Sequence, residues 1–208
     1  MPGDDAQLPV VSVDDADALD RAASALRAGG AVVVPTDTVY GVAALPSVPG
    51  ATDRLVRLKA RDPVQPVAVL VADAEQARAL VEPPSAQVAR WMSTLWPGPL
   101  TLVLGRSRDA AGLALNGDPA TIGLRCPDHP FLRALAGRVG PIATTSANRH
   151  GEPTPASARE AAASLTGPVA LVVDGGPAVG RLASTVVDAT VTPWRILREG
   201  VLDPALLT

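Results

Sequence analysis

Lys59 is the only lysine among the eighteen basic residues of the chain, and it stands two positions before Arg61 in the triplet Lys59-Ala60-Arg61. Lysine carries a compact point charge, whereas the arginine fork is planar and matches paired oxygens, so the pair could hold phosphate oxygens in two ways. Two solvated cations that complement the dipole at a helix C-terminus would give the same triplet. The hypothesis of an anion site therefore depends on the other polar segments.

A second polar segment, from Pro35 to Gly41, places hydroxyls and a carboxylate directly after the predicted strand 31–34. Open α/β sheets bind ligands beyond the carboxyl ends of their strands, which makes this segment a candidate for ligand contact. A turn in which Thr and Asp satisfy their own backbone is the alternative. The common glycine-rich phosphate loops are absent from the sequence, so a nucleotide site would have to be assembled from scattered segments.

Three further segments bring polar side chains to the ends of predicted strands. Arg125 ends the run 121–125 and could clamp a carboxylate in bidentate fashion, although a rim arginine paired with a surface acid is the alternative. Segment 144–148 supplies hydroxyls and an amide, which suit phosphate or ribose oxygens and equally suit a turn. The last segment contributes Ser184 and, a little further along, Arg198.

Cys126 and His129 lie just after Arg125, and we assign neither a catalytic role. Cys126 is interpreted as a small core residue, and His129 as a turn or cap residue that opens a helix over 131–136. One cysteine cannot form an internal disulfide, and no Cys/His cluster has zinc spacing. The sequence therefore predicts neither a secreted disulfide scaffold nor a metal site.

The composition favours one large domain over residues 1–208, with residues 1–9 as a flexible N-terminal tail. Aromatic residues make up only 2% of the chain, too few for a module that stacks on single-stranded RNA. A net charge of −3 argues against adhesion of the whole surface to a polyanion. The acidic N-terminus and the absence of a long apolar run predict a soluble, cytoplasmic protein without a membrane segment.

Short β-branched runs alternate with helical patterns, which is typical of an α/β layered domain. The frequent prolines predict a mixed, irregular sheet, and several strands with little alternation should be buried on both faces. Segment 105–119 has no periodicity and is interpreted as a mobile surface loop or lid. The predicted strands are 31–34, 67–71, 100–104, 169–173 and 185–187, and the predicted helices cover 19–26, 55–58, 131–136 and 158–165.

In their order and spacing these motifs closely resemble the YrdC-like family, from about Asp17 to Gly200. The resemblance implies a twisted, mixed α/β sheet with flanking helices around a concave basic cavity. It also implies the activity of threonylcarbamoyl-AMP synthase, a nucleotidyltransferase that joins L-threonine, bicarbonate and ATP and releases diphosphate. The motifs that carry it are Pro35–Gly41, Lys59–Arg61, Trp96–Thr101, Arg125–Pro130, Thr145–Asn148, Ser184–Asp188 and Leu197–Gly200.

The resemblance implies a role for each matching position. It implies that a catalytic polar tetrad consists of Lys59, Arg61, Ser146 and Asn148. It implies that threonine is held by Thr38, Arg125, Ser146 and Ser184. It implies that ATP is contacted by Lys59, Arg61, Gln65, Thr121, Asn148, the Ala156 backbone and Arg198. The chain departs from the family where relatives can present a histidine, here Leu70, and where Gln65 replaces a common asparagine.

The resemblance further implies Mg²⁺ that arrives with ATP, held by substrate oxygens and water rather than by a protein cage. The implied partners are L-threonine, bicarbonate, ATP and the downstream machinery that transfers the threonylcarbamoyl group to tRNA, together with weak RNA binding. The chain resembles the short form of the family, without an extra C-terminal domain.

Two alternatives stay open at this stage, and a third is excluded. The same fold could serve as a module that binds double-stranded RNA or associates with the ribosome, although the acidic balance and scarce aromatics count against it. A carbamoyltransferase of hydrogenase maturation would need further domains that 208 residues cannot hold. A paralogue with another acceptor amine would share the fold and most of the motifs.

Overall fold

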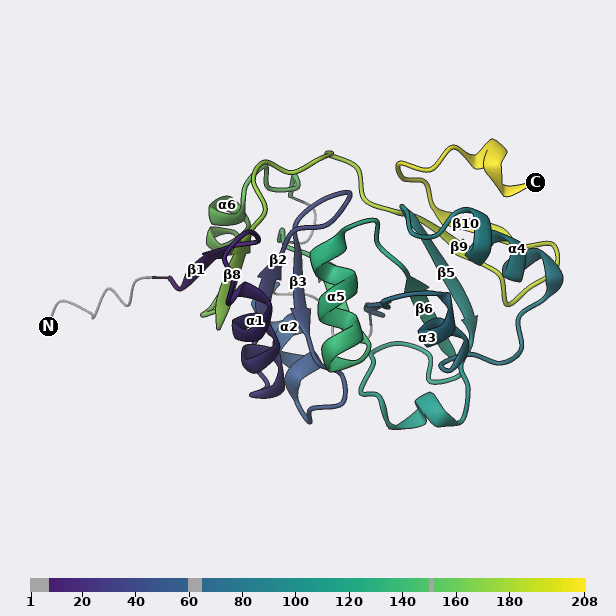
Figure 1. Ribbon diagram of the computed structural model, residues 1–208. Helices are drawn as coiled ribbons and strands as arrows, with labels where there is room; N and C mark the ends of the chain where they lie inside the picture. Colours follow the sequence, from purple (N-terminus) through teal and green to yellow (C-terminus); the bar gives the residue numbers. More distant parts are fainter. Residues whose placement is uncertain (1–7, 60–64, 150–151) are drawn as a thin grey trace, which may run out of the picture.

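A computed structural model of the chain describes residues 8–59, 65–149 and 152–208 (Figure 1). These residues form one ten-stranded sheet in the order β1-β8-β2-β3-β7-β4-β6-β5-β9-β10. The strands are β1 Val10–Ser12, β2 Val32–Val34, β3 Gly41–Ala44, β4 Ala68–Leu70, β5 Leu100–Gly105, β6 Thr121–Arg125, β7 Ile142–Ser146, β8 Leu171–Asp174, β9 Thr185–Asp188 and β10 Arg195–Arg198. The helices are α1 Ala18–Arg27, α2 Ala51–Leu58, α3 Ala74–Arg78, α4 Ala86–Thr94, α5 Pro130–Val139 and α6 Ala158–Ala163, with 3-10 turns η1 Asp109–Gly112 and η2 Pro204–Leu207.

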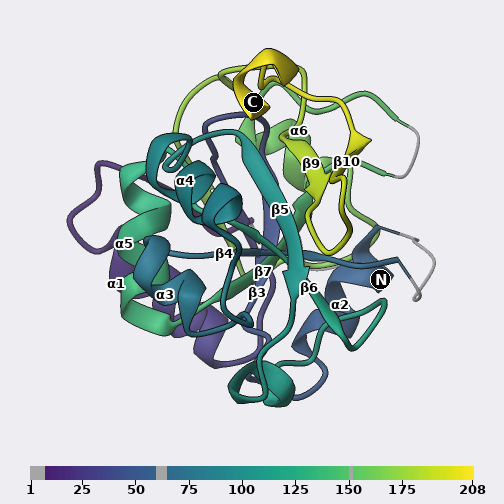
Figure 2. The same ribbon diagram turned by 90° about the vertical axis from the view of Figure 1, so that its right-hand side faces the viewer.

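The sheet mixes parallel and antiparallel neighbours, as the frequent prolines predicted. Strand β8 pairs in parallel with β1 and β2, whereas β3 pairs antiparallel with both β2 and β7. Further along, β4 and β6 are parallel, and β5 is antiparallel to β6 but parallel to β9. A 90° turn of the molecule brings the end of the sheet that holds β5, β6, β9 and β10 to the front (Figure 2).

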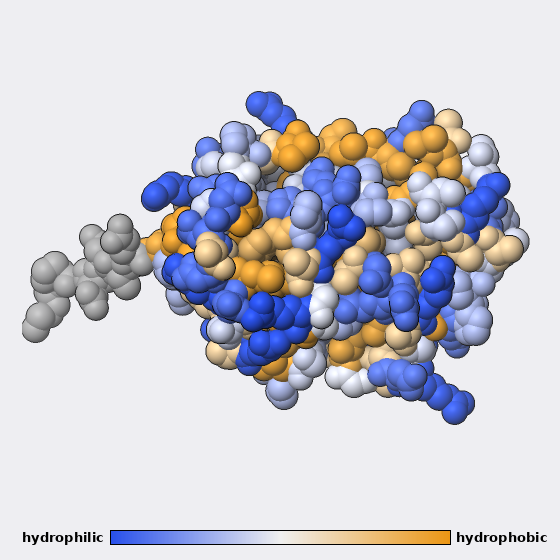
Figure 3. Space-filling model, in the orientation of Figure 1, coloured by the Kyte–Doolittle hydropathy of each residue, from blue (hydrophilic) through white to orange (hydrophobic). Residues whose placement is uncertain are grey.

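Around β1, β8, β2 and β3, helices cover both faces of the sheet. Val32 and Val34 pack into the core under α1 and α5, whereas Val33 between them packs into the core under α2 and α6. This arrangement confirms the prediction that strands with little alternation are buried on both faces. The outward face of the α1 and α5 layer carries hydrophilic residues interspersed with apolar ones (Figure 3).

The other half of the sheet has helices on one face only. Leu100, Leu102 and Leu104 of β5 pack with α4, whereas Thr101 and Val103 point to the opposite face. Because side chains alternate along a strand, each strand in this half contributes a second, uncovered row of residues. That uncovered face is where the candidate site lies.

Helices α3 and α4 did not emerge from periodicity, because α3 is a single short turn and the apolar stripe of α4 is brief. Both helices begin at N-cap side chains: Asp73 accepts from the Gln76 N–H at 2.8 Å, and Ser85 accepts from the Val88 N–H at 3.3 Å. The capping residues Asp73 and Ser85 were the signal in the sequence from which the starts of the two helices could be predicted.

Segment 105–119 has internal structure that its irregular composition did not predict. It contains η1, and the Arg106 guanidinium donates to the carbonyls of Ala110 and Leu113, both at 2.5 Å. At the N-terminus, the Pro9 carbonyl accepts from the Val172 N–H at 2.8 Å, so the end of the predicted tail joins the sheet edge. Residues 1–7 lie outside the described residues. In the described part of the chain, helices fall short of the length and apolarity that a bilayer crossing requires.

Candidate functional site

The uncovered face of β5, β6 and β9 forms the floor of a cavity of about 540 Å³. The ends of β3, β4 and β7 close it on one side, and Asn116 and Asp118 of the segment after η1 close another. Alternation explains the floor: Thr121, Gly123 and Arg125 face the cavity, whereas Leu124 faces the core. Segments far apart in the sequence therefore meet in one hollow.

Lys59 reaches the cavity from the C-terminal end of α2, and the residue is only 4% exposed. Its ammonium donates to the Ser146 carbonyl at 2.5 Å and to the Ser146 hydroxyl at 3.1 Å. Longer contacts of 3.4 Å each join it to Thr145 Oγ1 and to Asn148 Oδ1. Three members of the predicted tetrad therefore lie together, while Arg61 lies outside the described residues.

The end of β7 is held in place by β3. Gly41 pairs with Ser146, and a Cβ at Gly41 would lie 2.9 Å from Thr144 Oγ1, so this close pairing requires a glycine. Beyond the strand, the Ala147 N–H donates to the Tyr40 carbonyl at 2.8 Å. The motif Pro35–Gly41 thus positions Ser146 through the backbone.

The same motif also forms a turn of its own. The Thr36 hydroxyl accepts from the N–H groups of Thr38 and Val39 at 3.0 and 3.1 Å, which is the self-satisfied turn that the sequence allowed as an alternative. Thr38 nevertheless lines the cavity. The segment therefore forms a turn and also places Thr38 on the cavity lining.

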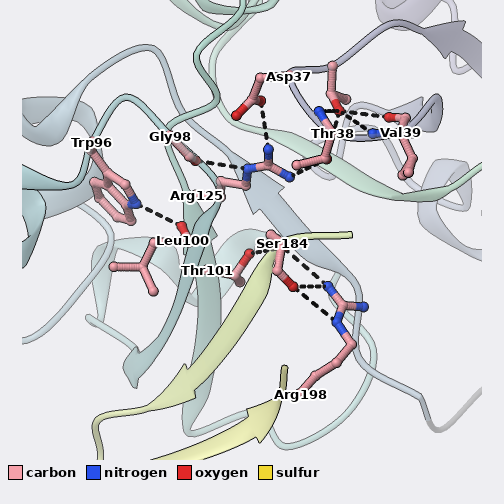
Figure 4. Close-up of polar contacts among 11 residues, drawn as sticks. Asp37, Thr38, Val39, Trp96, Gly98, Leu100, Thr101, Arg125, Ser184 and Arg198 are labelled. Atoms are coloured by element: carbon pink, nitrogen blue, oxygen red, sulfur yellow. Dashed lines mark hydrogen bonds and ion pairs between the residues drawn. The ribbon is translucent and has the colours of Figure 1, made fainter. Parts of the chain in front are cut away.

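Arg125 ends β6 and is 6% exposed, with all three guanidinium nitrogens engaged (Figure 4). Its Nε donates to the Gly98 carbonyl at 3.1 Å, one terminal nitrogen donates to Thr38 Oγ1 at 3.1 Å, and the other contacts Asp37 Oδ1 at 2.6 Å. Each terminal NH₂ group carries a second N–H, so the fork can still bind an anion. Its partner acid is well covered, because the Asp37 side chain is only 12% exposed.

Ser184 and Arg198 also meet on the cavity floor (Figure 4). Arg198 donates to the Ser184 carbonyl through Nε at 3.1 Å and through a terminal nitrogen at 2.8 Å, and that nitrogen lies 3.1 Å from Ser184 Oγ. Ser184 Oγ is also 2.8 Å from Thr101 Oγ1. A Cβ at Gly200 would lie 2.3 Å from the Ala183 carbonyl oxygen, so the glycine lets β10 approach Ser184 closely.

The remaining predicted residues divide into two groups. Thr121 and Leu70 line the cavity. Gln65 and Ala156 are not part of its described lining, although the neighbouring Pro66 is, and the Ala156 N–H donates to Glu160 Oε2 at 2.9 Å. Contacts of Gln65 and of the Ala156 backbone with ATP stay predictions.

The charged side chains on the described lining are Lys59, Arg125, Arg198 and Asp118. Cys126 and His129 lie off this lining. Burial raises the pKa of the Cys126 thiol to about 11 and lowers the pKa of the His129 imidazole below its ordinary value. The thiol is therefore protonated at neutral pH, so it is a poor nucleophile.

The arrangement can hold anions on Lys59, Arg125 and Arg198, and hydroxyl and amide groups share the same lining. Fixed cations and dipoles of this kind stabilise charge that develops during group transfer, without a nucleophilic triad. Reasoning from motifs gave Thr101 no role, whereas Thr145 belongs to the polar segment 144–148 that it proposed. The signal for Thr101 was available, because alternation along a strand with core-facing Leu100 and Leu102 puts Thr101 on the other face.

Fold and site together define an α/β protein whose twisted mixed sheet carries a polar cavity built from strand ends. The Sua5/YciO/YrdC family, described as telomere recombination, matches residues 24–200, and the chain belongs to this family.

Individual relatives agree with this assignment. Threonylcarbamoyl-AMP synthase of Bacillus subtilis is 36% identical over 181 residues, which cover 86% of this chain and 52% of that protein. A Mycobacterium tuberculosis relative is 37% identical over 179 residues, and the match covers 86% of this chain and 82% of the relative. The structure of Pyrococcus abyssi Sua5 complexed with L-threonine superposes with a TM-score of 0.84 at 32% identity, over 96% of this chain and 59% of that one. The chain thus spans about half the length of the Bacillus relative.

Proposed function

We propose that the protein is a threonylcarbamoyl-AMP synthase, a nucleotidyltransferase that makes threonylcarbamoyl-AMP and diphosphate from L-threonine, bicarbonate and ATP. The observation that carries the proposal is the meeting of Lys59, Ser146 and Asn148 with Arg125 and Ser184 around one cavity. Relatives that bear this enzyme name, and a relative solved with L-threonine, support it.

The reaction has two balanced steps. The threonine amine attacks the carbon of bicarbonate, a C–N bond forms, and water leaves to give a carbamate. A carbamate oxygen then attacks the α-phosphorus of ATP, and the bond from that phosphorus to the bridging oxygen breaks, so diphosphate leaves with the electron pair. Negative charge crowds the reacting centre throughout, and positioning and charge stabilisation are therefore the main tasks of the protein.

The residues of the cavity suit these tasks. Arg125 would bind the threonine carboxylate, with Thr38 beside it, and Ser184 would contact the amino acid at the same end of the cavity. Lys59 would place its charge against the nucleotide phosphates, while Ser146 and Asn148 accept hydrogen bonds from its ammonium. Arg198 and Thr121 would contact ATP from the floor, and Arg61 would complete the tetrad. The cavity as a whole would then be basic.

The donor set also fits magnesium that enters with ATP. Among the described residues no group of three His, Cys, Asp or Glu side chains could hold a metal, and Asp118 is the carboxylate on the described lining. Magnesium typically keeps several waters and binds one or two carboxylates plus substrate phosphates. Asp118, directly or through water, would be the protein contact, and the ion would supply charge neutralisation on the phosphates.

We further propose that residues 1–208 act as a single YrdC-like domain in the cytoplasm. The product is a reactive mixed anhydride, so a downstream enzyme must transfer its threonylcarbamoyl group to tRNA. Weak RNA binding beside the cavity would serve that hand-over.

The test is diphosphate release from ATP and bicarbonate, measured with threonine, with serine and with no amino acid. We expect diphosphate release that depends on threonine and on bicarbonate. Release that prefers another amine would identify a paralogue with a different acceptor. Steeply salt-dependent binding of double-stranded RNA together with no release would instead support an RNA-binding module.

A further inference from the structure

Thr101 forms a hydroxyl pair with Ser184 on the cavity floor. The two oxygens are 2.8 Å apart, and the two residues are each only 4% exposed. Thr101 lies on β5, Ser184 directly precedes its parallel neighbour β9, and both residues line the cavity. No role for Thr101 follows from the proposed tetrad or from the residues proposed to hold threonine.

Hydrogen-bond accounting shows what the pair can offer a ligand. Arginine can only donate, so the 3.1 Å contact from Arg198 occupies one lone pair of Ser184 Oγ. Only one of the two hydroxyl protons can lie between Thr101 and Ser184. Among the described residues, neither hydroxyl has another acceptor, so the second proton is available to the cavity, and so is a lone pair on Thr101. The pair can therefore both donate to and accept from one ligand group.

The position of the pair relative to Arg125 defines which group that would be. The register Leu102↔Leu124 between antiparallel β5 and β6 places Thr101 beside Arg125, and both face the cavity. Cross-strand neighbours have Cβ atoms about 5 Å apart, so the side chains of Thr101 and Arg125 leave the floor side by side. A carboxylate on Arg125 thus leaves the side chain of the same molecule within reach of Thr101 and Ser184.

Two valines also lie near the pair on the cavity floor. Val103 follows Thr101 on the same face of β5, Val186 of β9 lies two residues after Ser184, and both valines line the cavity. A ligand group here would meet hydroxyls on one side and valine methyls on the other. A β-carbon that carries one hydroxyl and one methyl matches this mixed lining.

We propose that Thr101 is a further specificity-determining residue: together with Ser184 it binds the side-chain hydroxyl of the amino-acid substrate and so distinguishes threonine from isosteric valine. This inference rests on the proposed function. A site built to hydrogen-bond a substrate hydroxyl rejects the analogue that lacks it, because its own buried polar groups would otherwise lose their partners.

The test compares Thr101→Val, which keeps the shape and removes the hydroxyl, with Thr101→Ser, which restores a hydroxyl. The same change at Thr52→Val is the control, because Thr52 is buried in α2, away from the described lining, and its hydroxyl has no hydrogen-bond partner. Threonine-dependent diphosphate release is measured for each protein, with KM determined separately for threonine and for ATP, and with valine as a competing amine.

Thr101→Val is expected to raise the KM for threonine about tenfold and to reduce the preference for threonine over valine, with the KM for ATP changed less than about twofold. Thr101→Ser should recover most of the lost affinity, and Thr52→Val should behave as wild type. An unchanged threonine KM in Thr101→Val, or an equal rise in both KM values, would overturn the inference while leaving the proposed function intact. No threonine-dependent release by the wild-type protein would overturn both.

Discussion

The buried cations Lys59 and Arg125 on the cavity lining are each held by several oxygen partners. Lys59 is almost fully buried, and a buried ammonium is tolerated only where oxygens replace its water. The Ser146 carbonyl and hydroxyl supply those oxygens, and both belong to the strand end that the sequence marked as polar. The lone lysine does line the cavity, but its partners could not be read from the sequence, since β7 reaches α2 only through the folded sheet.

Replacing Lys59 tests whether its charge acts in the reaction. Lys59→Ala should lower the rate of threonine-dependent diphosphate release at least about 100-fold, because a preorganised cation beside the phosphates is lost. Arg57→Ala removes an exposed cation from the same helix and is expected to keep wild-type turnover. Stopped-time assays of both proteins, with circular dichroism to confirm folding, give the answer; similar turnover in the two variants would remove Lys59 from the mechanism.

Asp37 is the second residue whose role can be isolated, because it contacts Arg125 without lining the cavity. We predict that Asp37→Asn raises the KM for threonine about tenfold, since the guanidinium loses a charge-assisted contact that holds its plane. The KM for ATP should stay within about twofold. The exposed Asp53→Asn is the matched control. An Arg125 freed from its acid could instead attract the carboxylate more strongly, and a lower threonine KM would show that Asp37 restrains the site rather than orienting it.

Among the elements, those with long apolar patterns were predictable and those defined by local contacts were not. The valine run of β2 and the stripe of α1 both appear within a few residues of their predicted bounds, because burial dictates their composition. The short helices α3 and α4 depend on caps, and the ordered turn η1 depends on Arg106 binding nearby carbonyls. Such side chain-to-backbone contacts leave little periodic signal.

The hairpin of β9 and β10 positions Arg198, and Gly200 allows its close approach to Ser184. Gly200→Ala should lower the melting temperature and raise the KM for ATP, because the new Cβ would lie 2.3 Å from the Ala183 carbonyl oxygen. Gly112→Ala is the control, since a Cβ there meets no atom within 4 Å. Thermal unfolding and steady-state kinetics on both variants check the prediction, and equal behaviour of the two would mean that β10 shifts freely.

Asp188 stabilises the same hairpin in a pH-dependent way. Burial alone would raise the pKa of its carboxyl, but hydrogen bonds from Thr190 and from Arg195 outweigh burial and hold the pKa below its ordinary value of 3.8. A pKa that is lower in the folded state stabilises the protein above the unfolded value, and this stabilisation is lost as the pH falls through the folded pKa.

We therefore expect Asp188→Asn to lower the free energy of unfolding by about 1 kcal/mol at neutral pH, a modest value because Arg195 is largely exposed. The difference from wild type should shrink as the pH falls below 3.8. Urea titrations across this range measure it. A difference that stays constant down to acid pH would mean that the carboxylate charge is not what holds the hairpin.

The whole molecule joins two differently built halves of one sheet. Where helices cover both faces, β2 carries valines throughout, whereas β5 alternates between a leucine core and a polar cavity floor. The α/β class and the mixed sheet followed from composition and proline frequency. The strand order did not, because β3, β7 and β4 are neighbours only through long-range pairing.

At the scale of the whole molecule, we propose that one cavity joins the carbamate of an amino acid to the first phosphorus of ATP. Mass spectrometry of the reaction with carbon-13 bicarbonate, threonine and ATP tests it most directly. The account predicts one product that contains threonine, the labelled carbon and AMP, formed by the wild-type protein and nearly absent with Lys59→Ala. ATP turnover without this labelled adduct, or equal adduct from both proteins, would contradict it.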